Sequence, residues 1–337
     1  PPPVPLPFHP EVSLTHIRVA AAQYPIEQVQ SFAAWQEKLT RWVEEAAALG
    51  ATLAIFPEYA AMELAGIDPE RAADLTASLD LVMQFGEAYD HVHAELAARL
   101  DIMILAGSRP VRESDGRIVN RARLFCADGT TGHQDKIMMT RFERERWGIS
   151  GGDSINLIHT PIGPVGISIC YDVEFPMIAR AQAEAGAKLI LTPSATDTMQ
   201  GYWRVRIGAQ ARAMENQCFV VQSPSVGMAP WLPCMDENFG AAGAFGPPDG
   251  AIPDDGVIAL GQANGPAWVV ADIDLAMVDQ LRADGTVLPF RHWPEQHVPF
   301  HIIQNGAGSD VIAQMASDAA RDDAPAAPQI EDQEIAE

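Results

Sequence analysis

VGISICYD, residues 165–172, carries a thiol at the point where an apolar strand is expected to end. Its first five residues show strand-like alternation, and residues 173–186 after it are typical of a helix. Cys170 therefore lies on an expected short turn from a buried strand into a helix, where an α/β enzyme places a nucleophile. The alternative is that Cys170 is a small buried hydrophobe, as free cysteines commonly are.

On both sides of this stretch, expected strands alternate with expected helices. Apolar strands are predicted at residues 17–23, 52–56, 101–106, 188–192, 218–223 and 267–273, with hairpins over 121–136 and 155–170. Helices are predicted at residues 34–49, 75–100 (one helix or a pair), 203–216 and 275–282, and a polar loop at 141–152. This order predicts a single layered α/β domain with mixed sheets.

Composition limits the class of partner. The 337 residues are 47% hydrophobic, enough for a sizeable core, and their formal net charge is −23. Such a surface repels nucleic acids and anionic membranes, so we expect neither as a partner. No apolar run approaches the roughly 20 residues of a membrane span, and the opening PPPVPLPFHP lacks the features of a secretory signal.

The chain divides by composition into three parts. Residues 1–16 are rich in proline and are predicted to form an extended arm, residues 17–303 form the α/β domain, and residues 304–337 form an acidic, disordered tail. Four widely separated cysteines make no CxxC pair, so neither a zinc site nor a disulfide framework is expected, and a reducing cytoplasm is the simplest location. Apart from Cys170, we interpret Cys126, Cys218 and Cys234 as inert thiols.

Three reactive groups of complementary type each follow an apolar strand: Glu58, Lys136 and Cys170. Any one of them alone is more often a solvated strand end. Together they form a catalytic set, because a thiol needs a base or a positive charge to become a thiolate at neutral pH. Glu58 can accept the proton, and Lys136 with the backbone N–H of Tyr171 can stabilise an oxyanion.

Three short sequences occur in this order along the chain: Phe56-Pro57-Glu58, Asp135-Lys136 and Ile169-Cys170-Tyr171-Asp172. The chain also contains Gly152-Asp153, Phe175-Pro176 and QARAMEN at 210–216. Over residues 15–290 the chain thereby resembles the nitrilase (carbon–nitrogen hydrolase) superfamily with its Glu–Lys–Cys triad. Within this superfamily the chain resembles an amidohydrolase-like branch, in Asp172 to Pro176, residues 196–198 and residues 202–206. Some members of that branch are fused to an acetyltransferase domain. We expect no such extra domain in this chain.

The resemblance implies an α/β fold, a four-layer αββα sandwich that stacks into an eight-layer homodimer. It implies attack of Cys170 on a small amide, carbamoyl or nitrile carbon, with Glu58 as general base and Lys136 as oxyanion stabiliser. Ammonia or an amine leaves, water hydrolyses the thioester, and no metal or organic cofactor is needed. Many members use a second glutamate after the lysine, and Glu143 and Glu145 are both candidates here. The spacing from Lys136 favours Glu143, whereas the spacing back from Gly152 in other branches favours Glu145; we expect Glu143.

Further residues carry weaker signals. Arg212 and Glu215 are spaced to pair across one helical turn as structural support. His91 and His93 diverge on a helix and are expected to be exposed rather than to bind a metal. The alternative of a Cys–His dyad with His133 or His159 explains less of the chain. The residues predicted to line the substrate pocket, each of which has packing as its alternative role, are Tyr59, Tyr171, Asp197 and Tyr202, with Trp203 beside them.

Three functional hypotheses remain. The first is a hydrolase of a small amide, favoured over a nitrilase because nitrilase branches tend to carry tryptophan where this chain has Tyr171. The second is acyl or amido transfer from the same thioester to an amine. The third is a non-catalytic binding protein on this fold, which the presence of all three groups disfavours. The substrate side chain stays open, since it depends on the loops at 60–71 and 227–265.

Overall fold

The computed structural model describes residues 15–299, 301–304 and 307–310. The described chain divides after Phe290 into two units, of which the first holds every candidate site residue. The second contains a hairpin of β15 (His301–Gln304) and β16 (Ala307–Asp310). Residues 1–14 of the predicted arm and 311–337 of the predicted tail lie outside the described part.

The first sheet is built around β1 (His16–Pro25). Its strands β1, β2 (Leu53–Ile55) and β3 (Met103–Arg112) are parallel, and β4 (Ile118–Phe125) and β5 (Thr131–Asp135) follow in antiparallel order. The late strand β14 (Ala267–Asp274) pairs antiparallel with the other side of β1, and the short β6 (Ile149–Ser150) pairs with β4. Segments far apart in sequence thus close one edge of the sheet.

The second sheet contains the strand that leads to Cys170. The hairpin of β7 (Leu157–Thr160) and β8 (Gly163–Ile167) is followed by the parallel strands β9 (Leu189–Ser194) and β10 (Phe219–Met228). The remaining strands are β11 (Glu237–Asn238), β12 (Gly243–Phe245) and β13 (Val257–Leu260). The end of β1 pairs with β10 through Tyr24 and Ser225, so the two sheets share one ladder.

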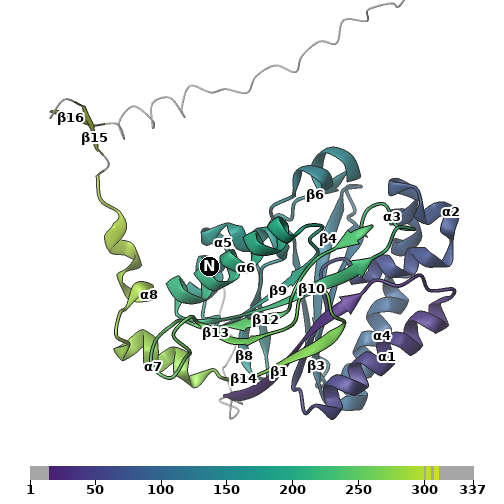
Figure 1. Cartoon of the computed structure of the whole chain (residues 1–337), viewed down its shortest axis with the longest axis horizontal. Helices are drawn as coiled ribbons and strands as arrows, with labels where there is room; N and C mark the ends of the chain where they lie inside the picture. Colours follow the sequence, from purple (N-terminus) through teal and green to yellow (C-terminus); the bar gives the residue numbers. More distant parts are fainter. Residues whose placement is uncertain (1–14, 300, 305–306, 311–337) are drawn as a thin grey trace, which may run out of the picture. The chain divides into compact units, whose positions relative to one another are not determined.

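Helices cover the outer face of each sheet (Figure 1). The first sheet is covered by α1 (Phe32–Ala48), α3 (Leu75–Gln84) and α4 (Gly86–Leu100), and the second by α5 (Pro176–Glu184) and α6 (Met199–Asn216). The smaller helical segments are η1 (Ala60–Ile67), α2 (Pro69–Ala72), α7 (Ala276–Asp284), α8 (Pro289–His292) and η4 (Trp293–Gln296). Among the helices described, none has the length and apolar character that a membrane span requires.

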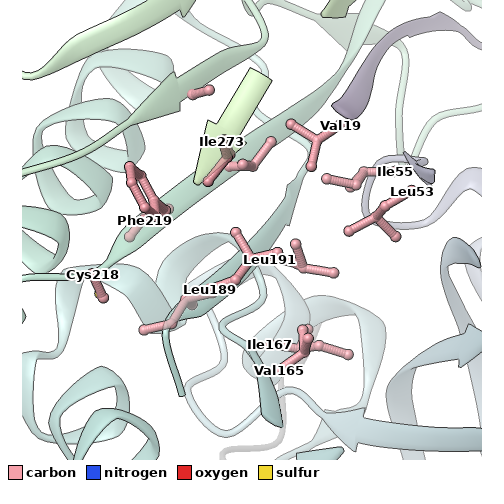
Figure 2. Packing of buried hydrophobic residues seen from close by; sticks show 14 of the residues in the cluster. Val19, Leu53, Ile55, Val165, Ile167, Leu189, Leu191, Cys218, Phe219 and Ile273 are labelled. Atoms are coloured by element: carbon pink, nitrogen blue, oxygen red, sulfur yellow. The ribbon is translucent and has the colours of Figure 1, made fainter. Parts of the chain in front are cut away.

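The core between the sheets follows from the two-residue alternation of the strands. Figure 2 shows Val19, Leu53 and Ile55 of the first sheet beside Val165, Ile167, Leu189 and Leu191 of the second. On β1, Ala20 and Ala22 point the other way, into the cluster with the helices. The predicted four-layer sandwich is therefore confirmed within the chain.

Several element boundaries differ from the predictions for local physical reasons. Residues 75–100 form a helix pair that breaks at Phe85. The helix predicted from residue 203 begins at Met199, because the Thr198 side chain accepts a hydrogen bond from the N–H of Gly201 at 3.1 Å. The predicted loop at 141–152 contains a π-helical turn, Glu143–Trp147. After Ile167 the chain leaves the strand, and η3 (Cys170–Glu174) precedes α5, which opens with proline.

The two histidines of α4 lie on different sides of the helix. His91 is exposed and pairs with Glu95 at 3.3 Å, as expected of a surface residue. The prediction that His93 is also exposed is wrong, since only 1% of it is accessible. Residues two positions apart on a helix are separated by about 200° around its axis, so when one of them faces solvent the other faces the core. Aromatic rings surround the imidazole of His93: Trp35, Phe56, Tyr89 and Phe125.

Candidate active site

Glu58, Lys136 and Cys170 come together although they belong to different strands. Glu58 follows β2, Lys136 directly follows β5, and Cys170 lies three residues after β8. Each strand end thus delivers one side chain to the same buried place. Glu58 and Lys136 are each 1% accessible and Cys170 is 4% accessible.

Two of the site residues adopt an unusual backbone conformation. Cys170 has φ 48° and Tyr59 has φ 55°, both in the left-handed region that side chains other than glycine rarely occupy. The hydroxyl of Ser108 accepts a hydrogen bond from the Tyr59 N–H at 2.8 Å, which helps to hold the turn after Glu58. Such strain persists where the surroundings fix it, and it commonly marks functional turns.

The ammonium of Lys136 lies between two carboxylates. Its Nζ donates to Glu58 Oε1 at 2.7 Å and to Glu143 Oε2 at 2.6 Å. Burial alone would lower the pKa of Lys136, but the charges of Glu143 and Glu58 outweigh it and raise that pKa well above its ordinary value. Lys136 is therefore a fixed positive charge and cannot serve as a base near neutral pH.

Glu58 is held by neutral donors as well as by Lys136. The side-chain amide of Asn120 donates to its Oε1 at 2.9 Å, and the N–H of Ala195 donates to its Oε2 at 3.0 Å. Burial raises the pKa of Glu58 above its ordinary value, Lys136 opposes this shift, and the charge of Glu143 adds to it. A buried carboxylate with a raised pKa is suited to accept a proton from a neighbouring thiol.

The surroundings of the Cys170 sulfur favour its protonated form. Its Sγ donates to the carbonyl oxygen of Ala195 at 3.7 Å. Burial raises the pKa of Cys170 well above its ordinary value, and the negative charge of Glu58 adds to the shift while Lys136 opposes it. Reaction of this thiol therefore requires that its proton moves to a base, and Glu58 is the adjacent carboxylate.

Of the two glutamates left open, Glu143 lies in this cluster. It accepts from the Tyr59 hydroxyl at 2.7 Å and from the Thr140 N–H at 2.9 Å, in addition to Lys136. Burial would raise the pKa of Glu143, but Lys136 and these donors lower it below its ordinary value. Glu145 instead lies on the surface, where both its oxygens pair with Arg141 at 2.9 Å.

Asp172 ties two parts of the site together, a role that its place in the motif did not reveal. Its carboxylate accepts from the N–H of Ile137 at 3.1 Å, of Met138 at 2.7 Å and of Ile169 at 3.3 Å. The backbone after Lys136 is thus fixed to the residue before Cys170. Burial raises the pKa of Asp172 to about 7, against the effect of these donors and of Lys136.

A pocket of about 580 Å³ opens over Cys170. Tyr171 and Asp197 line it, as predicted for substrate-binding residues, whereas Tyr59 and Tyr202 are buried outside its lining. The Tyr59 hydroxyl is occupied by Glu143, and the Tyr202 hydroxyl accepts from Arg206 at 3.2 Å. The other lining residues include Thr140, Phe142, Ala195, Gly201 and the segment from Pro233 to Asn238.

Of the other single residues with weaker signals in the sequence, only Cys234 lines the pocket, and the rest lie outside its lining. Arg212 and Glu215 form the expected ion pair on α6 at 2.8 Å. Neither His133 nor His159 lines the pocket. Cys126 and Cys218 are buried, but Cys234 lines the pocket and is half-buried. Across residues 15–299, no group of three or more potential ligands is arranged to hold a metal ion.

A buried thiol, a buried carboxylate and a fixed ammonium lie beneath an open pocket, and these are the groups that nucleophilic chemistry by a thiol requires. The chain belongs to the carbon–nitrogen hydrolase family, whose model matches residues 18–283. It is 36% identical over 271 residues to the probable hydrolase YhcX of Bacillus subtilis, a match that covers 80% of this chain and 52% of YhcX. The chain thus spans about half the length of that relative.

Other relatives agree with this assignment. The omega-amidase NIT2 of Homo sapiens is 28% identical over 219 residues, covering 61% of this chain and 74% of that protein. Among solved structures, a carbon–nitrogen hydrolase from Helicobacter pylori superposes with a TM-score of 0.66 at 19% identity, over 83% of this chain and 94% of the other. Nit3 of Saccharomyces cerevisiae, a member of the nitrilase superfamily, gives 0.63 at 21% identity over 81% and 95%. These two structures show the shared fold.

Proposed function

We propose that the protein hydrolyses the non-peptide carbon–nitrogen bond of a small amide, giving a carboxylate and ammonia or an amine. The observation that carries this proposal is the position of Lys136 Nζ, 2.7 Å from Glu58 and 2.6 Å from Glu143, in the buried cluster that contains Cys170. The relatives named amidases, and the family to which the chain belongs, support it.

In the first step the Cys170 sulfur attacks the amide carbon. A bond forms between Sγ and that carbon while the thiol proton passes to Glu58. The substrate oxygen becomes negative and is stabilised by the ammonium of Lys136 and the backbone N–H of Tyr171. Because a neutral thiol and a carboxylate become a thiolate and a neutral acid, the total charge of the buried cluster does not change during the proton transfer.

In the second step the intermediate collapses to a thioester. The carbon–nitrogen bond breaks, and Glu58 returns its proton to the nitrogen, so that ammonia or an amine leaves. Water then attacks the thioester carbon and gives a proton to Glu58, the carbon–sulfur bond breaks, and the proton returns to Sγ of Cys170. The carboxylic acid that is released loses its own proton to solvent and becomes the carboxylate. Throughout, Glu143 keeps Lys136 charged and in position.

Ammonia release from a panel of small amides tests the proposal. We expect the wild-type protein to release ammonia and the Cys170→Ala variant to release none while its circular dichroism spectrum and melting temperature persist. Cys126→Ala, which removes a buried thiol away from the pocket, is the matched control and should stay active. An active Cys170→Ala variant contradicts the mechanism. Including a nitrile and a competing amine in the panel, with product analysis by mass spectrometry, separates amidase from nitrilase and from acyl transfer.

The expected partner is a second copy of the chain. On α6, Trp203, Ile207 and Met214 lie within about 40° of one another around the helix and are 44%, 60% and 50% exposed. Met177 of α5 adds a further side chain that is 64% exposed. An apolar face of this kind supports packing of two such helix layers against each other. Light scattering should give a dimer, and Ile207→Asp should shift it toward monomer.

We also propose the cytoplasm as the location of the protein. The mechanism needs Cys170 as a thiol, and all four cysteines of the chain are free. Fractionation of the native cells, with the protein detected by antibody, tests this proposal; recovery from an oxidising compartment would contradict it.

A further inference from the structure

The charges that line the pocket are unevenly balanced. Four of the lining side chains are acidic and two are basic, and none of those described is lysine or histidine. The acidic residues are Glu174, Asp197, Asp236 and Glu237, and the basic ones are Arg141 and Arg204. The balance alone is negative, but what a ligand meets depends on which of these charges are already paired.

Both basic side chains are engaged with carboxylates. Arg141 uses Nε and Nη2 to bind both oxygens of Glu145, each at 2.9 Å, in the bidentate geometry that satisfies a guanidinium best. Arg204 pairs with Glu174, whose Oε1 lies 3.3 Å from its Nε. Neither arginine therefore presents an uncompensated positive charge to the pocket.

Three acidic side chains remain without a basic partner among the described residues: Asp197, Asp236 and Glu237. They come from two segments, one after β9 and one at β11, which are fixed to each other beside the pocket. The Phe239 N–H donates to the carbonyl of Thr196 at 2.7 Å, and the Thr196 hydroxyl donates to the carbonyl of Phe239 at 2.7 Å. The two segments thus hold their carboxylates at the same pocket.

One feature opposes this negative potential. The amino end of α6 faces the pocket through Gly201, and a helix amino end acts as roughly half a positive charge. Asp197 precedes the cap of this helix by one residue, so its own charge more than cancels the helix end. The charges of Asp236 and Glu237 are then left over, and the pocket has a net negative potential.

We propose that the substrate is an amide whose remaining part carries a positive charge, such as the protonated amine of an ω-amino amide. The inference rests on the proposed amide hydrolysis at Cys170 and names the class of substrate for that site. The cationic end lies toward Asp197, Asp236 and Glu237, while the scissile amide lies against Cys170. A substrate with a carboxylate at the same place meets uncompensated acidic side chains and is disfavoured.

Three amides of equal length test the proposal: hexanamide, 6-aminohexanamide and the monoamide of adipic acid. We expect kcat/KM to fall in the order cationic, neutral, anionic amide. Each acidic side chain should contribute about a two- to fivefold difference in kcat/KM between the cationic and the neutral amide, since exposed charges interact weakly. Higher salt should narrow the differences. A preference for the anionic amide, or no preference at low salt, overturns the inference while hydrolysis itself supports the proposed function.

Charge-neutralising variants locate the effect. Asp197→Asn, Asp236→Asn and Glu237→Gln should each reduce the ratio of cationic to neutral kcat/KM by about two- to fivefold. Glu37→Gln makes the same change of charge on α1, which covers the other sheet, and should leave the ratio unchanged. If the pocket variants behave like this control, the three carboxylates do not select the substrate.

A second probe keeps the inference testable if no amide is hydrolysed. Methanethiosulfonate reagents with a cationic, neutral or anionic tail form a mixed disulfide with Cys170 and release methanesulfinate. Peptide mass spectrometry separates labelling at Cys170 from labelling at Cys234. Relative to reaction with a free thiol, the cationic reagent should label Cys170 fastest and the anionic one slowest. Equal relative rates would refute the charge preference, whatever the fate of the proposed function.

Discussion

The buried imidazole of His93 is expected to make the fold sensitive to acid. Its Nδ1 lies 2.8 Å from the Tyr89 carbonyl oxygen, and its ring is packed against Trp35 and Phe125. Burial lowers the pKa of His93 to about 4, a shift that the hydrogen bond to Tyr89 only partly opposes. The folded protein therefore holds this ring neutral, whereas in the unfolded chain its pKa is about 6.5.

The direction and size of the effect follow from linkage. As pH falls below about 6.5, the unfolded chain binds a proton at this site and the folded chain does not, so folding stability is lost until the folded pKa of about 4 is reached. With these two pKa values, the cost is about 0.2 kcal/mol at pH 7 and about 2 kcal/mol at pH 5. His93 alone should thus remove nearly 2 kcal/mol of unfolding free energy between these pH values.

The variant His93→Phe keeps an aromatic ring in the same surroundings and removes the titration. Urea unfolding at pH 7 and pH 5, followed by tryptophan fluorescence, measures the free energy of unfolding of both proteins. The loss on going to pH 5 should be smaller for the variant by about 2 kcal/mol. Other titrating groups cancel in this difference. His91→Phe, at an exposed position of the same helix, is the control and should follow the wild type. Equal losses for wild type and His93→Phe would refute the reasoning.

Three further predictions concern the site itself. Glu143→Gln should lower kcat about 100-fold, because Lys136 loses one of its two carboxylates, whereas Glu145→Gln should change kcat less than twofold in the same ammonia assay. Lys136→Met should lower kcat about 100- to 1000-fold by removing the charge at the oxyanion, and similar kcat values for Lys136→Met and wild type would contradict that role. Asp172→Asn should lower kcat more than it raises KM, and it should cost about 1–3 kcal/mol of the free energy of unfolding, measured with urea. The reason is that an amide cannot accept hydrogen bonds from all the backbone donors that the carboxylate binds. An effect on KM alone would argue against a role of Asp172 in positioning Cys170.

Sequence alone could indicate the fold because the decisive signals are local. The alternation over residues 165–169 and the helix-forming character of residues 173–186 are each recognised from a few neighbouring side chains. Their order along the chain then indicates a layered α/β domain with mixed sheets, and the four-layer sandwich was implied only by the resemblance to the carbon–nitrogen hydrolases. The same local reasoning failed for His93, because which side of α4 faces the core depends on distant packing partners, Trp35 of α1 and Phe56 directly after β2.

The site could be predicted only where chemistry marks the residue type. Glu58, Lys136 and Cys170 are reactive groups at strand ends, and the structure brings them together. Asn120 carries no such mark, because an amide inside β4 resembles any other polar strand residue until its distance of 2.9 Å to Glu58 is known. Only part of the pocket wall could be predicted: Tyr171 and Asp197 line it, but within the loop at 227–265 no periodicity singles out the segment from Pro233 to Asn238.

The choice between Glu143 and Glu145 shows how backbone geometry decides chemistry. The two side chains are two positions apart on the turn Glu143–Trp147, so they point to different sides and only one can face inward. The inward one gives the buried cluster two carboxylates for one ammonium, an excess of one negative charge. Burial raises the pKa of the Cys170 thiol, and the negative charge of Glu58 adds to this shift against the effect of Lys136, so that a free thiolate is disfavoured. The sulfur should therefore react only together with proton transfer to Glu58, which ties nucleophilic attack to the presence of a substrate in the pocket.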